Sequence, residues 1–195
     1  MPSSITHEQL TQEEFENILD AMKTHYVATI KGESSEPLPR SLSSYRIASL
    51  EKNDSLNEFE EKLKKETSSG LSAWKDKAEP QITELTKKKV NNEISDDDWN
   101  DQIEKRKKAD KDEACKQIDD AYDKVKKRGN AHPEERGALL QLADFVSLGI
   151  LDIVNIVVDF IEDLAQKISE WLKAAYEYIK QTFVTVDNAI SDIFG

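Results

Sequence analysis

Hydrophobic positions recur every three or four residues along most of the chain, the spacing that places side chains on one face of an α-helix. The first such stripe runs from Phe15 to Ile30. Thr11 and Glu14 form a capping-box pair in front of it, and Gly32 follows it as a typical helix stop. We therefore predict that residues 1–32 contain the first helix.

A second region, residues 53–130, is highly charged and only thinly apolar. It follows residues 33–52, which are rich in serine, include two prolines and predict a connector. Its apolar positions come at about two in every seven residues, as in a coiled-coil seam. Ser95, followed three residues later by Asp98, marks the start of a new helix within it. The pattern predicts a long antiparallel, coiled-coil-like helical hairpin that either packs on the rest of the protein or projects from it.

Two residues are expected to shape this hairpin. Pro80 lies inside the apolar pattern of the first arm, where a proline removes a backbone hydrogen bond and clashes with the preceding turn. We therefore expect a kink near residues 76–80, or a break into two helices. Gly129, between Arg128 and Asn130, lies at the end of the second arm, and we expect the helix to stop at these three residues.

The C-terminal region, residues 131–195, is much more apolar, and only six residues are polar between Ala138 and Ile161. Its aspartates are spaced so that they share one stripe of a helix, which leaves a wide apolar face around them. The acidic strip comprises Asp144, Asp152 and Asp159. The apolar face, on which we place the activity, comprises Leu142, Val146, Ile150, Ile153, Val157, Phe160, Ile161 and Trp171.

This pattern allows two interpretations of the C-terminal helix. In the first, it is the central helix of a bundle, and the other helices cover its apolar face. In the second, part of the face stays uncovered and binds a partner helix, another copy of the chain or lipid. Three aspartates oppose insertion as a lone transmembrane helix. A membrane role would therefore need a helix that lies flat on lipid, or several copies that turn the acidic strip toward water.

The composition supports a helical protein and narrows the range of partners. Of the 195 residues, 34% are charged and 37% are hydrophobic, a mixture typical of long exposed helices. The formal net charge of −12 argues against a nucleic-acid partner, whose phosphates need a positive surface. It also argues against simple electrostatic attachment to anionic lipid. We predict an all-α, elongated helical bundle in which residues 1–195 form a single helical domain.

One acidic stretch resembles part of a calcium-binding EF-hand loop. Asp96, Asp98 and Asn100 match the first three ligand positions of that loop. The glycine and the final glutamate that the loop requires are replaced by Asp101 and Lys107. Because neither the turn nor the last ligand is present, we interpret the stretch as the charged first turn of a helix.

Two DDxxD runs, residues 97–101 and 119–123, resemble the magnesium–diphosphate motifs of all-α prenyltransferases. That family is much longer, and its two motifs face each other across a cavity, whereas both runs here are expected on one helix. The three histidines form no short metal-ligand spacing, and Cys115 is the only cysteine. We therefore expect no enzyme activity, no metal and no cofactor.

These observations favour a non-enzymatic interaction protein that binds a protein partner or assembles with itself through its C-terminal amphipathic helix. The alternative is a membrane-active protein, pore-forming or lipid-binding, that inserts residues 138–183. The first residues carry neither a cationic nor an apolar signal segment, so we expect a cytoplasmic location. Secretion as a mature or non-classically exported form stays open.

Overall fold

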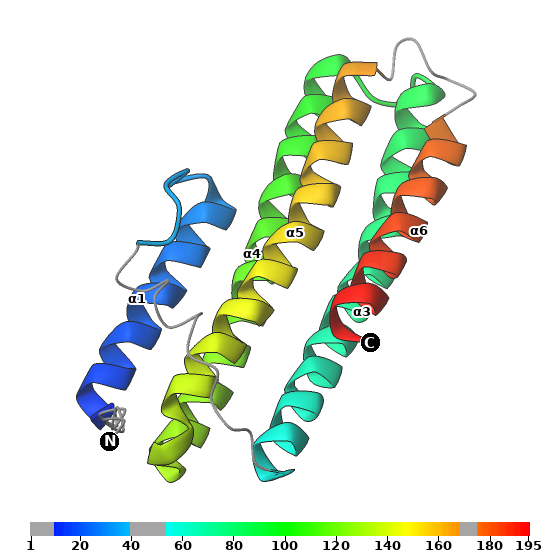
Figure 1. Cartoon of the computed structure of the whole chain (residues 1–195). Helices are drawn as coiled ribbons and strands as arrows, with labels where there is room; N and C mark the ends of the chain where they lie inside the picture. The colour runs from blue at the N-terminus through cyan, green and yellow to red at the C-terminus, as the bar shows by residue number, and fades with distance from the viewer. Residues whose placement is uncertain (1–9, 40–53, 168–174) are drawn as a thin grey trace, which may run out of the picture.

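The computed structural model describes residues 10–39, 54–167 and 175–195 of the chain. Within these ranges it contains five α-helices, one short 3₁₀ helix and no strand, so the predicted all-α bundle is confirmed (Figure 1). The elements are α1 (Gln12–Lys31), α3 (Asp54–Val90), α4 (Asp96–Ala131), the 3₁₀ helix η2 (Pro133–Glu135), α5 (Arg136–Lys167) and α6 (Ala175–Phe194).

The antiparallel pair of α4 and α5 runs through the middle of the molecule (Figure 1). On one side of this pair lie α3 and α6, and α6 packs on both α3 and α5. On the other side α1 packs on α4 and α5, but it covers only the end of the pair where α4 finishes and α5 begins. As a result α4 and α5 together form the centre of the bundle.

Local signals in the sequence place the helix ends as predicted. Thr11 caps α1: its hydroxyl accepts a hydrogen bond from the backbone N–H of Glu14, and the Glu14 side chain accepts one from the Thr11 backbone. Gly32 ends α1 in the left-handed region, at φ 78°, where a residue without Cβ carries no steric cost. Ser95 caps α4 through the backbone N–H of Asp98.

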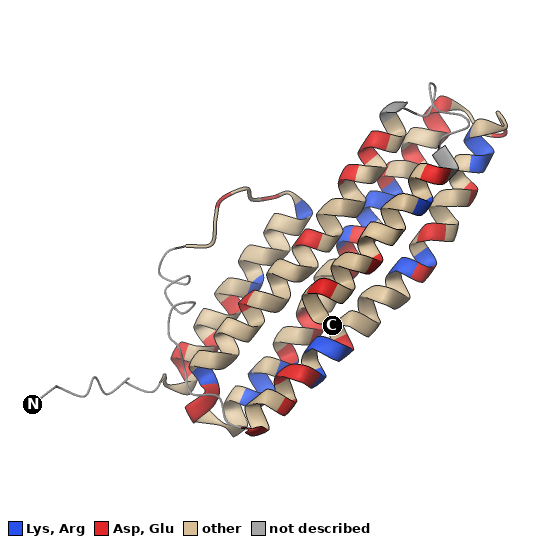
Figure 2. Cartoon of the chain, turned by 45° about the vertical axis from the view of Figure 1, so that its right-hand side comes forward, with Lys and Arg blue, Asp and Glu red and all other residues tan. Residues whose placement is uncertain are grey.

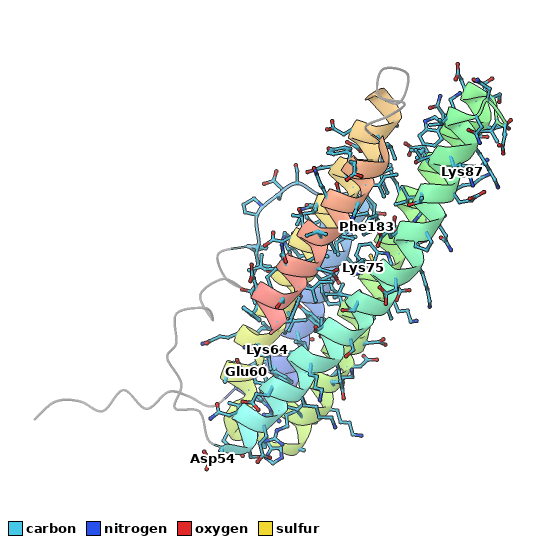
Figure 3. All side chains as sticks on the ribbon, turned by 90° about the vertical axis from the view of Figure 1, so that its right-hand side faces the viewer. Asp54, Glu60, Lys64, Lys75, Lys87 and Phe183 are labelled. Carbon is cyan, nitrogen blue, oxygen red and sulfur yellow. The ribbon has the colours of Figure 1, made fainter. Side chains whose placement is uncertain are left out.

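The hairpin prediction is only partly confirmed. Helices α3 and α4 are antiparallel neighbours joined by the short turn at residues 91–95. However, α3 packs mainly on α6, and α4 packs mainly on α5, so a coiled-coil seam between the two arms is not confirmed. An ion pair of 2.8 Å between Lys75 and Asp187 links α3 to α6, and Figure 3 shows Lys75 where the two helices run side by side. Neither arm projects as a stalk.

Of the two outcomes predicted at Pro80, the break into two helices is wrong, because α3 is one continuous helix of 37 residues. The kink near residues 76–80 stays a prediction. Pro80 is exposed, and Asp76, whose carbonyl loses its usual partner four residues later, is exposed as well. Water can therefore satisfy that carbonyl. The apolar side of α3 meanwhile stays packed both before and after the proline, at Trp74, Ala78 and Ile82.

Helix α4 ends at Ala131, one residue beyond the predicted stop at residues 128–130, and Gly129 lies inside the helix rather than at its cap. Gly129 is buried, and a Cβ atom built on it would lie 2.3 Å from the Phe15 ring of α1. The glycine therefore serves close packing of α1 on α4. Phe15 itself is fully buried, so its ring has no open space into which it can move.

We expect Gly129→Ala to destabilise the protein by about 1–2 kcal/mol, as overpacking of the Phe15 ring outweighs a gain of about 1 kcal/mol in helix propensity. Urea unfolding followed by circular dichroism measures the change. The matched control is Gly70→Ala in α3, where the added Cβ meets only the flexible end of Gln117. The control should be neutral or slightly stabilising. If Gly129→Ala costs no more stability than Gly70→Ala, the Phe15 ring can move aside to admit the new methyl group.

Residues 183–194 belong to the 20-residue helix α6. This helix runs antiparallel to α5 and packs on α3 and α5, on the side of the α4–α5 pair opposite α1 (Figure 1). Its last turn lies on α5 at Gly149, where an added Cβ would come within 2.6 Å of Ile193 and 2.7 Å of Phe194.

Candidate interaction surface

The apolar face of the C-terminal helix lies inside the protein. Its members from Leu142 to Ile161 sit on α5, and each is at most 6% exposed. They face α4, α1 and α6, and together they form the centre of the hydrophobic core. Trp171, the last member, lies outside the described residues. In this fold the described members of the predicted interaction face are not accessible to a partner.

The acidic strip divides into an exposed part and a buried part. Asp152 and Asp159 are exposed, as is Asn155 between them. Asp144 is only 5% exposed, and it accepts a hydrogen bond from the hydroxyl of Tyr26 on α1. Asp144 therefore belongs to the α1–α5 contact, and the accessible strip begins after it.

The surface of α5 also carries two large apolar side chains. Phe145 is 40% exposed and Leu148 is 37% exposed. The ammonium of Lys64 on α3 lies 4.9 Å from the centre of the Phe145 ring, and Figure 3 labels Lys64 at this part of the bundle. The Phe145 ring also meets Phe194 edge to face, at 6.3 Å between ring centres.

We name the exposed line Phe145, Leu148, Asp152, Asn155 and Asp159 the outer stripe of α5. Its members follow one another at steps of three and four residues, so they occupy one side of the helix. Sequence reasoning missed the two apolar members because it assigned every apolar residue of the segment to the opposite face. The spacing to Asp152 and Asp159 was the signal that could have placed them on the stripe.

A polar cluster is buried between α3 and α4. The carboxylate of Asp110, which is fully buried, accepts a hydrogen bond of 2.8 Å from the indole N–H of Trp74. The guanidinium of Arg106 donates to both Asp110 oxygens, with 2.8 Å from Nε to Oδ2. Burial lowers the pKa of Arg106 from its ordinary value. Every polar atom of this carboxylate has a donor, which is typical of a structural ion pair.

A second buried polar contact joins α4 to α5. The hydroxyl of Ser147 lies 3.0 Å from the hydroxyl of Tyr122 and 2.8 Å from the carbonyl oxygen of Ala143. Burial raises the pKa of Tyr122 well above its ordinary value, so the phenol stays protonated in the folded protein. Its hydroxyl is enclosed in the core and faces no cleft, so this contact serves packing.

The acidic runs are exposed on helix α4. Asp96 and Asp98 lie in its first turn, where Asp96 pairs with Lys89 and Asp98 accepts from Ser95. Both DDxxD runs lie on α4, as expected, and Asp119 pairs with Lys23 of α1 at 3.2 Å. Partners within the protein thus account for the carboxylates of Asp96, Asp98 and Asp119.

Among the described residues, the side chains of His132, Glu134 and Glu135 lie close enough to hold a metal ion. Both oxygens of Glu135 already accept hydrogen bonds of 2.6 Å from Arg128, which leaves this carboxylate poorly suited to a cation. Cys115 is buried, and burial raises the pKa of its thiol, which disfavours the reactive thiolate. His7 lies outside the described residues.

In the part of the chain that the structure describes, no helix is both long enough and apolar enough to cross a membrane. Lys and Arg residues alternate with Asp and Glu residues along the outer sides of the helices (Figure 2). The outer stripe of α5 is therefore the best candidate for a functional surface. The chain matches no protein-family model, no curated protein and no solved structure.

Proposed function

We propose that this protein is a non-enzymatic interaction protein that binds a protein partner, or a second copy of itself, through the outer stripe of α5. The observation that carries the proposal is the exposure of Phe145 and Leu148, one turn apart, on the most apolar helix of the bundle. Aromatic and aliphatic side chains at the centre of an interface contribute most of the binding energy.

Charge next to these anchors supports the same proposal. Asp152 and Asp159 are exposed, and no ion pair within the described residues joins either of them to a cation. Charges of this kind on the rim of an interface orient a partner and speed its association. The partner surface should therefore offer an apolar hollow flanked by lysine or arginine.

The test compares the wild type with Phe145→Ser/Leu148→Ser. The two proteins are immobilised on beads and exposed to a cell extract of the source organism. Sedimentation velocity measures self-association in parallel. We expect the variant to lose one specific retained protein, or to lose self-association, by roughly 30-fold in affinity. The matched control is Val184→Ser on α6, which changes a side chain that is 50% exposed. Retained proteins and sedimentation identical for the wild type and the stripe variant would contradict the proposal.

The width of the buried apolar face of α5 favours a second candidate function, which is membrane activity through residues 138–183. If α5 and α6 left the bundle, this face would be available to the acyl region of a lipid surface. Co-sedimentation and dye release with neutral and anionic vesicles, at pH 7 and pH 5, test this function. Absence of binding at both pH values would eliminate it.

A further inference from the structure

A groove of about 380 Å³ opens between α3 and α4, at the end of the bundle where Figure 3 labels Asp54. Its apolar lining comes from Phe59 and Leu63 of α3. The guanidinium of Arg128 lies 5.6 Å from the centre of the Phe59 ring. The groove therefore combines an apolar floor with a cationic wall, and the buried face of α5 does not contribute to it.

The lining of this groove is positive, although the whole chain carries a net charge of −12. Lys62 and Lys124 share one carboxylate, that of Glu66, at 4.0 Å and 2.7 Å. Lys127 lines the groove too, and no ion pair within the described residues neutralises it. The groove thus holds uncompensated positive charge, and a ligand that fits it should be acidic.

The outer stripe of α5 has the complementary chemistry. Asp152 and Asp159 are seven residues apart, which is about 10 Å along a helix. The α3 side of the groove, from Phe59 to Glu66, spans the same number of residues and therefore about the same length. At 0.15 M salt, charges more than about 8 Å apart are largely screened, so these local charges outweigh the general repulsion between two acidic copies.

We infer that the α3–α4 groove receives the outer stripe of α5 from a second copy of this chain. The inference rests on the proposed function, because it names the partner of the stripe. The lysines of the groove would face Asp152 and Asp159, and Leu148, one turn before Asp152, would lie at the Phe59 end of the groove. Because the two surfaces differ, the contact is head to tail, and it adds further copies in a ring or a filament.

Sedimentation velocity of the full chain, at 50 mM and 500 mM NaCl, tests the inference with three charge-reversal variants. The groove variant is Lys62→Glu/Lys127→Glu, and the stripe variant is Asp152→Lys/Asp159→Lys. The control, Lys105→Glu/Lys116→Glu, makes the same change of net charge as the groove variant on exposed residues of α4 outside the groove. Circular dichroism checks that each variant keeps the helical fold.

The wild type and the control should associate at 50 mM NaCl, and association should weaken at least tenfold at 500 mM. The groove and stripe variants alone should stay monomeric at the concentrations where the wild type associates. Their equimolar mixture should associate again, because the reversed stripe then faces the reversed groove and the unchanged stripe faces the unchanged groove. Restored pairing also shows that neither variant has simply lost its fold.

The alternative results separate the two proposals. If the stripe variant is monomeric while the groove variant associates like the wild type, the groove inference is overturned and the proposed function stands. If the groove and stripe variants both associate as strongly as the wild type, the groove inference and the proposed function both fail for self-assembly. A wild type that is monomeric at every concentration and salt overturns the groove inference, and retention of a different protein by the stripe then decides the proposed function.

Discussion

Ile150→Asp is expected to leave the protein largely unfolded at 25 °C. Ile150 is fully buried at the centre of α5, where a carboxylate would have neither water nor a cation. The loss of apolar burial and the desolvation of the new charge together should cost more than about 4 kcal/mol. A loss of this size removes most of the stability of a domain at the lower end of the usual range of about 5–15 kcal/mol. Far-ultraviolet circular dichroism and urea unfolding measure the effect.

Leu148→Asp, two residues earlier on the same helix, is the matched control. It introduces the same side chain at a position that is 37% exposed, so the carboxylate can stay hydrated. Its cost should be about 1 kcal/mol or less. The contrast tests whether the apolar face of α5 is core or an accessible surface, since similar losses at Ile150 and Leu148 would contradict the burial of the face in this fold.

Removal of the buried carboxylate in Asp110→Ala should have the second largest effect, a loss of about 3 kcal/mol. The substitution leaves Arg106, whose side chain is 13% exposed, without its counterion, and it leaves the indole N–H of Trp74 without an acceptor. An uncompensated buried charge costs about 3–5 kcal/mol, and the partial exposure of Arg106 brings the expected value to the lower end. Urea unfolding at pH 7 provides the measurement.

Two further variants define the cause of this loss. Asp112→Ala removes an exposed carboxylate from the same helix and should change stability by less than about 0.5 kcal/mol. Asp110→Leu/Arg106→Met replaces the whole ion pair by apolar side chains and should recover part of the stability. If the double variant is as unstable as Asp110→Ala, lost packing rather than an orphaned charge explains the effect.

The element boundaries that sequence reasoning placed correctly are those set by local bonds. Thr11 and Ser95 cap their helices with hydrogen bonds to residues three positions later, and Gly32 takes the left-handed backbone that ends α1. Each of these needs only near neighbours in the chain. Pro80 does not break α3, because it lies at an exposed position on a helix that is packed along its length. Gly129 lies inside α4 rather than at its cap, because the ring of Phe15 packs against it.

The candidate surface also has one part that local sequence predicts and another that tertiary packing decides. Periodicity identified α5 as the most apolar helix and placed its aspartates on one stripe, because helical spacing is a property of consecutive residues. It could not tell Asp144 from Asp152, which the pattern treats alike. Helix α1 covers the first of them and supplies the hydroxyl of Tyr26, while no helix covers the second.

Local order along the chain was therefore enough to establish an all-α protein, the positions of its caps and the apolar character of α5. Tertiary packing settled which side of α5 meets α1, α4 and α6, and so which of its residues remain exposed. The physical reason is the range of the interactions. Capping and periodicity act within four residues, whereas the cover over Leu142–Ile161 comes from helices up to about 120 positions away in sequence, such as α1 with Tyr26 against Asp144.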